Sequence, residues 1–334
     1  MLALKLRIGL PTEVLPKALV NSQGGGHPVK KLLLSILLST LFVTAFAPLP
    51  SLGCIAIPAR PDDSPLEMKL PEQRAFLYRK GSTEHMILSV QYNGATEEFA
   101  WVIPTETRAR VDVQDGAPFH ELWTITKMRK PMSRKATYAA APAGAAQSVQ
   151  VLERKQAGPY DIAVLKAGTS DGLYQWLRGN GFGLNASTRN ALDSYIEKDW
   201  YFVAARIRPK KRGQVQSKLH NGTIAPLHIS YKASELSYPM RVTAGNPGIS
   251  KIELFVLADK PTEHAGLAAH TFRLSPQGKD GFKVDGPPNS VTTSGSFPTL
   301  RKLLPSGGTL TKYSGTLGTA QRQRDLVFQR LAAR

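Results

Sequence analysis

The chain has 334 residues, of which 42% are hydrophobic, and it carries 43 lysines and arginines against 25 aspartates and glutamates, a net charge of +18. This composition supports a packed core and argues against general disorder, and the charge predicts attraction to anionic polymers or surfaces without assigning a function. The single cysteine, Cys54, excludes an internal disulfide and a cysteine-based zinc site.

The N-terminal segment is typical of a secretory signal. Two lysines precede the apolar run 32–47, and proline and small residues follow it. The run is shorter than the roughly 20 residues that a membrane-spanning helix needs. Residues 1–28 are untypical of such a signal, so translation from Val29 is an alternative start. We therefore expect residues 1–53 to be a signal segment with an over-long start, either cleaved on export or retained as an anchor.

The processing site is expected at Gly53 and Cys54. Small residues at Ser51 and Gly53 suit a signal-peptidase cut that makes Cys54 the first mature residue. Leu52 stands one position closer to this cut than in a lipoprotein signal, so plain cleavage, lipidation of Cys54 and retention of the segment all stay open. In an oxidising compartment, a free thiol at this position would be capped or paired with another chain.

Two runs of alternating apolar residues within Glu84–Pro104 flank Asn93-Gly94, a pair that favours a two-residue hairpin turn. Counting the antiparallel pairing back from this turn places Met86 opposite Trp101. The pattern therefore predicts a hairpin in which Trp101 is buried beside Met86. A Trp101→Ala substitution is expected to cost about 3–5 kcal/mol of stability, because it would leave a large cavity.

The remaining elements follow from periodicity and from turn residues. Strands are predicted at Arg74–Lys80, Ser148–Arg154, Tyr160–Ala167, Trp200–Arg208, Pro226–Tyr231, Tyr238–Thr243, Lys251–Ala258 and Ala269–Leu274. Short helices are predicted at Pro118–Met128, Asp171–Arg178 and Ser187–Lys198. The segment Gly281–Gly308 is typical of a loop, and Thr309–Arg334 predicts a strand followed by a short amphipathic helix around Asp325–Leu331.

Strands outnumber helices in this pattern and do not alternate with them, which argues against a doubly wound parallel sheet. We predict an α+β protein with a mainly antiparallel β-sheet and a few short helices after the N-terminal signal segment. Residues 54–330 are expected to form a single domain, either continuous or divided at the alanine-rich loop 136–147.

Several segments, in a fixed order, resemble the blocks of one bacterial family. They are Tyr92–Gly94, Phe99–Pro104, Gly158–Leu165, Trp176-Leu177, Asn180–Phe182, Trp200–Ala204, Ile252–Asp259 and Asp325–Phe328, with Cys54 directly after the signal. Over about residues 54–330 the chain is similar to the domain-of-unknown-function family 2330. The resemblance implies an exported bacterial protein and carries no activity. Family members often have further cysteines that are absent here, so a disulfide or metal role suggested by those cysteines is not carried over.

One motif matches a catalytic pattern. The segment 168–172 reads G-x-S-x-G with Ser170 at its centre, and it stands between a predicted strand and a predicted helix, as a nucleophile elbow does. Asp259 and either His264 or His270 follow in the order of the hydrolases. The sequence has no glycine-rich oxyanion segment and lacks the strand–helix alternation of that fold. The same residues are good helix caps, which is the simpler interpretation.

Other polar clusters favour structural roles. Glu97 and Glu98 are neighbours on a predicted strand and therefore point to opposite faces. The histidines fit no standard helical metal-binding pair, whether His220 and His228 or His264 and His270 are considered. The glycine-rich segment 179–183 follows a helix and is interpreted as its C-terminal cap. We therefore predict neither a cofactor nor a metal site.

The basic clusters 127–135 and 206–218 are interpreted as solvated loops or as contacts to an anionic envelope component. No nucleic-acid partner is expected, because the second cluster lacks interleaved aromatic residues. The leading hypothesis is a non-catalytic binding or scaffolding protein of the cell envelope, periplasmic or extracellular. Membrane contact is expected only through an uncleaved signal or a lipid on Cys54. The alternative is an exported serine hydrolase that uses Ser170, Asp259 and His264.

Overall fold

A computed structural model describes residues 57–58, 73–90, 99–128, 149–182, 186–207, 225–244 and 249–331. The chain divides into two compact units, Met1–Ala47 and Pro48–Arg334, and every described residue belongs to the second. The expected signal segment, the processing site and the alanine-rich loop all lie outside the described residues. None of the described helices is long and apolar enough to cross a membrane.

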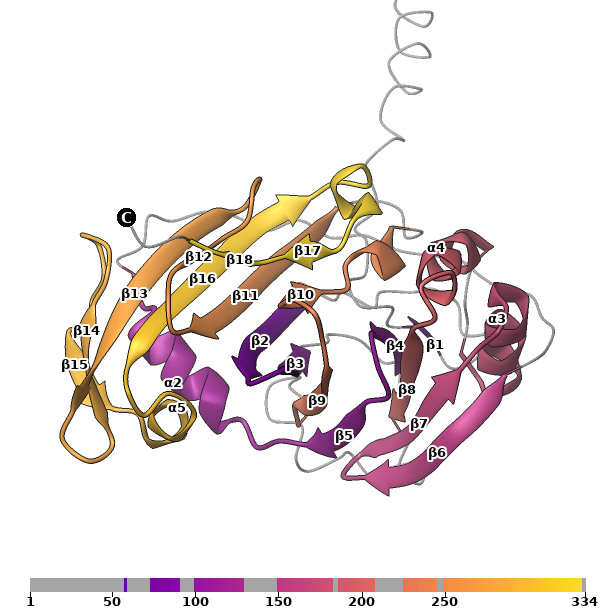
Figure 1. Cartoon of the computed structure of the whole chain (residues 1–334), viewed down its shortest axis with the longest axis horizontal. Helices are drawn as coiled ribbons and strands as arrows, with labels where there is room; N and C mark the ends of the chain where they lie inside the picture. Colours follow the sequence, from indigo (N-terminus) through magenta and orange to yellow (C-terminus); the bar gives the residue numbers. More distant parts are fainter. Residues whose placement is uncertain are drawn as a thin grey trace, which may run out of the picture. The chain divides into compact units, whose positions relative to one another are not determined.

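A nine-stranded sheet is one of two main sheets (Figure 1). Its strands are β2 (Gln73–Lys80), β3 (Thr83–Val90), β5 (Arg110–Val113), β9 (Leu227–Lys232), β11 (Ser250–Ala258), β13 (Ala268–Gln277), β14 (Gly281–Asp285), β15 (Ser294–Ser296) and β16 (Gly308–Leu317). Their spatial order is β15–β14–β13–β16–β11–β2–β3–β9–β5. Neighbouring strands are antiparallel except β11 and β2, which run parallel. This arrangement confirms the predicted α+β class with a mainly antiparallel sheet.

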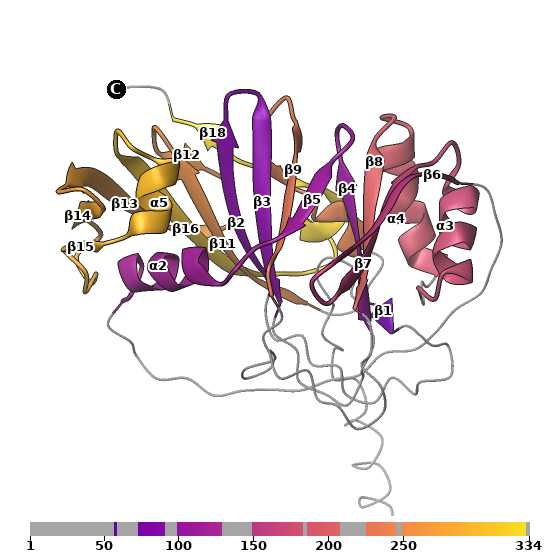
Figure 2. The same ribbon diagram turned by 90° about the horizontal axis from the view of Figure 1, so that it is seen from below.

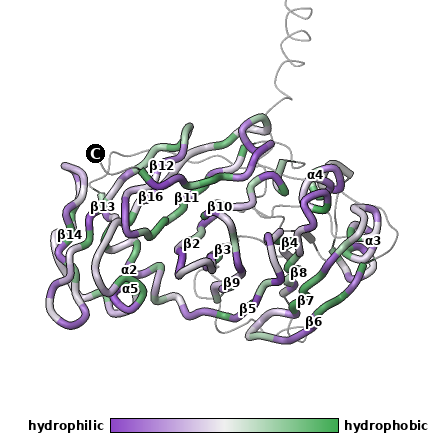
Figure 3. The backbone as a smooth tube through the Cα atoms, viewed as in Figure 1, coloured by the Kyte–Doolittle hydropathy of each residue, from purple (hydrophilic) through white to green (hydrophobic). Residues whose placement is uncertain are grey.

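The second main sheet is antiparallel throughout. Its strands are β1 (Ile57–Pro58), β4 (Phe99–Thr105), β6 (Gln150–Ala157), β7 (Tyr160–Lys166) and β8 (Tyr201–Ile207). Their spatial order is β1–β4–β8–β7–β6. The central strands β7 and β8 are largely hydrophobic (Figure 3). Strands that are covered on both faces carry such continuous apolar runs.

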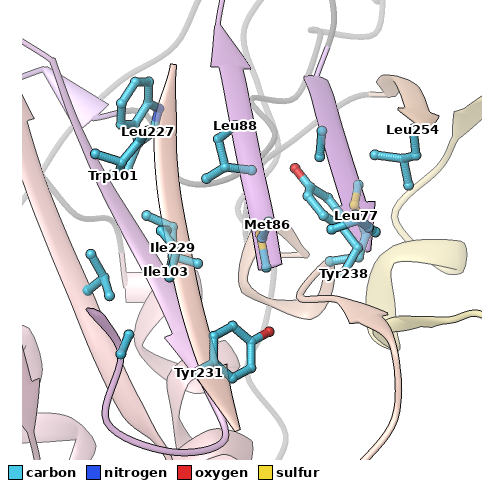
Figure 4. Close-up of a cluster of buried hydrophobic side chains, with 14 of the residues drawn as sticks. Leu77, Met86, Leu88, Trp101, Ile103, Leu227, Ile229, Tyr231, Tyr238 and Leu254 are labelled. Carbon is cyan, nitrogen blue, oxygen red and sulfur yellow. The ribbon is translucent and has the colours of Figure 1, made fainter. Parts of the chain in front are cut away.

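The two sheets pack face to face over the main hydrophobic core. Met86 and Leu88 of β3 and Ile229 of β9 lie in one cluster with Trp101 and Ile103 of β4 (Figure 4). Trp101 is 1% exposed, which confirms that it is buried. Burial of this size supports the expected cost of about 3–5 kcal/mol for Trp101→Ala, which stays a prediction.

Helices cover the outer face of each sheet (Figure 2). On the nine-stranded sheet these are α2 (Ala117–Ile125) and α5 (Pro298–Leu303), and on the five-stranded sheet they are α3 (Ser170–Gly179) and α4 (Ala186–Ile196). Helices α2, α3 and α4 each bury spaced apolar residues, as the predicted helices at 118–128, 171–178 and 187–198 required, whereas α5 buries Leu300 alone. The order of layers is therefore helix, sheet, sheet, helix.

The expected hairpin over Glu84–Pro104 is wrong. β3 pairs with β2 and β9, whereas β4 pairs with β1 and β8, so the two strands belong to different sheets. Met86 and Trp101 share the core between the sheets without facing each other on one ladder. Both strands turn an apolar face to the same core, and alternation alone does not reveal the ladder partner. The turn residues Asn93-Gly94 lie outside the described residues.

The hairpin in this part of the chain joins β2 to β3. Lys80 pairs with Thr83, which leaves Gly81 and Ser82 as the two turn residues. Gly81 has a φ of 61°, a left-handed conformation that favours glycine. A Gly-Ser turn therefore sets the register of β3 against β2, whereas Asn93-Gly94 was expected to set its register against β4.

The C-terminal third is more regular than predicted. The expected loop Gly281–Gly308 contains β14, β15 and α5. A Cβ on Gly281 would lie 2.6 Å from the carbonyl oxygen of Gln277 and 2.8 Å from that of Gly295. Its lack of a side chain therefore allows three backbone segments to approach one another closely.

The expected helix around Asp325–Leu331 is also wrong. This segment forms β17 (Leu326–Val327) and β18 (Gln329–Arg330), which pair with β10 (Ser237–Tyr238) and β12 (Thr262–Glu263). The carboxylate of Asp325 accepts hydrogen bonds from the Tyr195 hydroxyl at 2.5 Å and from the Arg241 amide at 2.9 Å. These tertiary contacts favour the extended conformation of the segment more than its apolar spacing favours a helix. The predicted strand Tyr238–Thr243 is shorter than expected, because a 3₁₀ turn begins at Arg241.

Candidate functional site

A pocket opens on the outer face of the five-stranded sheet, beside the C-terminal end of α3. Its volume is about 300 Å³, at the lower end of the range for small-molecule sites. Residues from β6, β7 and β8 line it, together with α3 and the segment that follows the helix. Three consecutive antiparallel strands and one helix end therefore build the site.

Small side chains form the floor of this pocket. Ala163 of β7 and Ala204 of β8 are cross-strand partners, and both line the pocket. The next pair on the same face, Leu165 and Phe202, is fully buried and fills the space beneath the helices. The cavity therefore lies over the small Ala163–Ala204 pair, directly beside the larger Leu165–Phe202 pair.

Aromatic rings form one wall. Trp176 projects from the last turn of α3, and the chain reverses through Asn180, the C-cap residue of the helix. The Phe182 amide donates a hydrogen bond to the Leu177 carbonyl at 2.9 Å, which brings the Phe182 ring to 6.2 Å from the Trp176 ring. Gly181 has a φ of 83° at this reversal. The segment 179–183 thus begins with the predicted helix cap.

Two arginines stand at the rim, and one residue orients both. The Arg154 guanidinium lies 5.4 Å from the centre of the Trp176 ring and donates to the Asn180 side-chain oxygen at 3.2 Å. The Arg206 guanidinium donates to the Asn180 backbone carbonyl at 3.3 Å. Because guanidinium has five donors in a fixed fork, each arginine keeps further donors for a ligand.

The charges at the rim are unevenly compensated. Asp161 lies 3.8 Å from Arg206, a long ion pair, and Lys155 pairs with Glu153 at 3.0 Å. Among the described residues, no carboxylate lies within ion-pair distance of Arg154. The pocket therefore presents a cation beside an aromatic wall and an apolar floor, a combination that attracts an anion with an apolar body.

The residues of the catalytic hypothesis lie in different layers. Ser170 is the first residue of α3, and Thr169 is the N-cap, whose side chain accepts a hydrogen bond from the Gly172 amide at 3.1 Å. The capping interpretation is therefore confirmed. Asp259 and His264 belong to the nine-stranded side, next to β11 and β12 (Figure 1). The structure does not bring Ser170 together with them.

Asp259 and His264 have partners of their own. The Asp259 carboxylate lies 3.5 Å from the Arg330 guanidinium. The His264 ring donates a hydrogen bond from Nδ1 to the Val327 carbonyl at 2.9 Å and lies against Phe328. Both side chains help to hold the C-terminal strands.

The histidines include one close pair, on the outer face of the nine-stranded sheet. Nδ1 of His85 lies 3.0 Å from Nε2 of His228, and Tyr78 stacks on His85 with ring centres 4.5 Å apart. Burial lowers the pKa of His85 to about 4, so this ring is neutral near pH 7. Within the described ranges, no group of three or more potential metal ligands converges. His220 and Glu97-Glu98 lie outside those ranges.

A buried carboxyl is another strongly perturbed group. Glu84 is fully buried and accepts hydrogen bonds from the Tyr231 hydroxyl at 3.0 Å and from the Ser237 amide at 3.1 Å. Burial raises the pKa of Glu84 to about 8. Its hydrogen-bond partners are internal, so Glu84 ties the start of β10 to the core rather than facing a ligand.

A second cavity, of about 430 Å³, lies at the end of the nine-stranded sheet. Its arginines are engaged by the protein. Arg79 donates to the carbonyls of Ala233 and Ser234, and Arg330 pairs with Asp259. The smaller pocket beside α3 is therefore the better candidate site, because its rim arginine Arg154 makes a single hydrogen bond, to Asn180, and has no ion-pair partner among the described residues.

Sequence reasoning did not find this site. In the sequence pattern Arg206 begins the basic cluster 206–218, Trp176 lies within the predicted helix Asp171–Arg178, and Arg154 ends the predicted strand Ser148–Arg154. The alanines of the floor meet only through the pairing of β7 with β8. One signal was available: the segments 158–165 and 180–182, which carry the family resemblance, both contribute to the pocket.

Comparisons with known proteins agree with that resemblance. A family model described as "Uncharacterized protein conserved in bacteria (DUF2330)" matches residues 53–275. Comparison with curated proteins finds no match. The crystal structure of baculovirus P35 is similar to this chain at 10% identity and a TM-score of 0.37, covering 80% of this chain and 99% of that one. A likeness at this level carries no argument about function.

Proposed function

Because the chain belongs to DUF2330, a bacterial family described as uncharacterised, we propose from its sequence and geometry that it is an exported, non-catalytic binding protein of the cell envelope. The ligand site is the pocket beside α3. The observation that carries this proposal is the preformed rim, in which Asn180 orients Arg154 and Arg206 beside the Trp176 ring. Preformed pockets with a few oriented polar groups are typical of ligand sites.

Binding rather than catalysis is supported by how the polar groups are used. Ser170 begins a capped helix, and Asp259 and His264 hold the C-terminal strands. A hydrolase would need these three groups within hydrogen-bond reach of one another. We therefore expect no labelling by a fluorophosphonate probe. Labelling that disappears in Ser170→Ala would contradict the non-catalytic part of the proposal.

The binding part can be tested with two matched tryptophan variants. Trp176 and Trp123 each stack on an arginine beneath an outer helix, but only Trp176 lines the pocket. The measurement is native mass spectrometry of the protein mixed with a small-molecule extract of the bacterial envelope. We expect an added mass on the wild type and on Trp123→Ala that is absent from Trp176→Ala. No added mass on the wild type, or the same mass on all three proteins, would contradict the proposal.

The export part rests on the apolar run 32–47 and on Gly53-Cys54. The proposed mature protein begins at Cys54, and its positive charge favours contact with an anionic envelope component. Intact-mass analysis of the exported protein tests this. A mass that begins at Cys54 without acyl groups supports plain cleavage, and added diacylglycerol supports a lipoprotein. A chain that still contains the run 32–47 contradicts both.

A further inference from the structure

Each outer layer of the molecule contains an arginine stacked on a tryptophan. On the nine-stranded side, Arg74 of β2 lies 5.1 Å from the ring centre of Trp123 in α2. On the five-stranded side, Arg154 of β6 lies 5.4 Å from the ring centre of Trp176 in α3. In both cases a strand supplies the cation and the helix above it supplies the ring, so the two sites can be compared residue by residue.

At the first site the protein supplies a carboxylate. Glu253 is the cross-strand partner of Arg74, and one of its oxygens accepts from the Arg74 guanidinium at 2.8 Å and from the Trp123 indole at 3.3 Å. The other oxygen lies 2.6 Å from the ammonium of Lys312, on the strand beyond. An arginine, an indole and a second cation thus bind one carboxylate.

At the second site the corresponding position is an alanine. The cross-strand partner of Arg154 is Ala163, and Arg206 is placed on the strand beyond as Lys312 is at the first site. The strand register shows that Lys312 and Arg206 hold corresponding positions. Lys312 is two residues from the partner of Glu253, and Arg206 is two residues from Ala204, the partner of Ala163. The cations and the ring are present at both sites, but the partner of Arg154 is an alanine. The carboxylate of the second site, Asp161, lies opposite Arg206 at 3.8 Å and leaves the position beside Arg154 to the floor of the pocket.

We propose that the pocket binds the carboxylate of a small ligand in the position that Ala163 leaves open, with Arg154 and Arg206 as its cationic partners. This inference rests on the proposed binding function and specifies its ligand class. The apolar body of the ligand lies on Ala163 and Ala204 and against Phe182. Charge-assisted hydrogen bonds from guanidinium to carboxylate are among the stronger polar contacts, and the apolar floor adds affinity.

The probes are benzoate, 3-phenylpropionate and hexanoate, each compared with its primary amide by isothermal titration calorimetry. The amide keeps the apolar body and removes the charge. We expect at least one carboxylate to bind about tenfold more tightly than its amide, a difference of about 1.4 kcal/mol. Because Arg154 is exposed, this preference should shrink as salt rises from low to physiological concentration and above.

Four variants locate the binding. Arg154→Gln should weaken carboxylate binding about tenfold and leave amide binding unchanged, whereas Arg273→Gln, an exposed arginine of β13, should change neither. Ala163→Glu should abolish carboxylate binding, because the new side chain takes the place that Glu253 takes at the first site. Ala163→Gln has the same size without the charge, so a folded Ala163→Glu protein should melt at a higher temperature than Ala163→Gln at pH 7.

Three results would contradict the inference, and each can be distinguished from a failure of the proposed binding function. Equal affinity for a carboxylate and its amide, lost in Trp176→Ala, would overturn the carboxylate assignment and leave the proposed binding function intact. No heat with any of the three carboxylates would also overturn the assignment, while the mass-spectrometric test with the envelope extract decides the binding function separately. Carboxylate binding that Arg154→Gln and Ala163→Glu leave unchanged would place the ligand elsewhere and overturn the inference.

Discussion

The two outer layers have the same architecture but differ in what fills the space beneath their helices. On the nine-stranded sheet, fully buried phenylalanines lie under α2 and α5, and Phe119 meets Phe255 edge to face at 6.3 Å. On the five-stranded sheet, Ala163 and Ala204 lie beside the end of α3 and leave a pocket. Small residues on two neighbouring strands therefore open a pocket beneath a helix without any change of the helix-on-sheet architecture.

The layers also differ in how they use charge. The buried carboxylate of Glu121 in α2 accepts hydrogen bonds from the amides of Thr299 and Leu300, both at 2.8 Å, and so caps α5. Glu253 is likewise bound by Arg74, Lys312 and Trp123. On the opposite layer, Arg154 is bound by a neutral amide. The nine-stranded layer therefore binds these carboxylates internally, whereas Arg154 of the five-stranded layer is exposed and has no carboxylate partner among the described residues.

The largest expected effect is in the filled layer. Phe255→Ala should cost about 3–5 kcal/mol of the free energy of unfolding, because Phe255 is fully buried and its ring is surrounded by other rings. Phe182→Ala should cost less, since the Phe182 ring borders the pocket. Guanidinium unfolding curves measure both. A cost below about 1 kcal/mol for Phe255→Ala would show that the two layers do not differ in packing.

The next effect comes from the internal carboxylate. Glu253→Gln should cost about 2 kcal/mol at pH 7, because it leaves Arg74 and Lys312 together without a counter-charge in a partly buried place. Burial raises the pKa of Glu253, but the hydrogen bond and charge of Lys312 and the charge of Arg74 lower it more, so the net pKa is below the usual 4.5.

The sign of the pH dependence follows from that lowered pKa. The stabilisation by Glu253 is fully present above pH 4.5 and is lost as the pH falls through the pKa of the folded state. The difference between wild type and Glu253→Gln in urea unfolding should therefore be large at pH 7 and should shrink in acid. The exposed Glu235→Gln serves as control. A difference that stays constant down to pH 2 would remove the charged role assigned to Glu253.

The third prediction compares two substitutions that enlarge a side chain, one in each layer. Gly286→Ala should cost about 1–3 kcal/mol, because its Cβ would lie 2.6 Å from the Phe272 ring in the filled layer. Ala163→Val should cost less than about 1 kcal/mol, because the pocket accepts the added methyl groups. Melting temperatures of the two variants give the ranking. The reverse ranking would mean that the pocket is not open space.

The smallest stability effect is expected for the proposed ligand residue. Arg154→Gln should change the free energy of unfolding by less than about 0.5 kcal/mol, because the side chain is exposed and has no ion-pair partner among the described residues. The same unfolding assay measures it. A loss above about 1.5 kcal/mol would instead make Arg154 a structural residue and would weaken the contrast with Arg74.

Much of the local structure could be predicted from the sequence. Apolar spacing and the cap-forming residues around Ser170 were sufficient to place α3 to within one or two residues, although the cap itself is Thr169, and β-prone runs placed most strands. Pairing could not be predicted in the same way, because β3 and β4 show equally regular alternation yet belong to different sheets. Alternation shows which face of a strand is buried but not which strand is its neighbour.

The candidate site depended on that missing pairing. Arg154, Ala163 and Arg206 come from three strands, and they converge only when β6, β7 and β8 pair in register. The hydrolase motif around Ser170 was visible because it is contiguous, and it proved to be a helix start. A contiguous motif is easily seen in one sequence, whereas a site assembled across strands requires the sheet order.

We propose above all that the pocket beside α3 binds a ligand carboxylate. That carboxylate occupies the position that the side chain of Glu253 occupies in the nine-stranded layer. The most direct measurement is a crystal structure of the protein with the carboxylate probe that binds most tightly. We predict a carboxylate oxygen within about 2.7–3.2 Å of the Arg154 guanidinium and an apolar body on Ala163 and Ala204. A ligand bound elsewhere, or one whose carboxylate points to solvent away from Arg154 and Arg206, would contradict it.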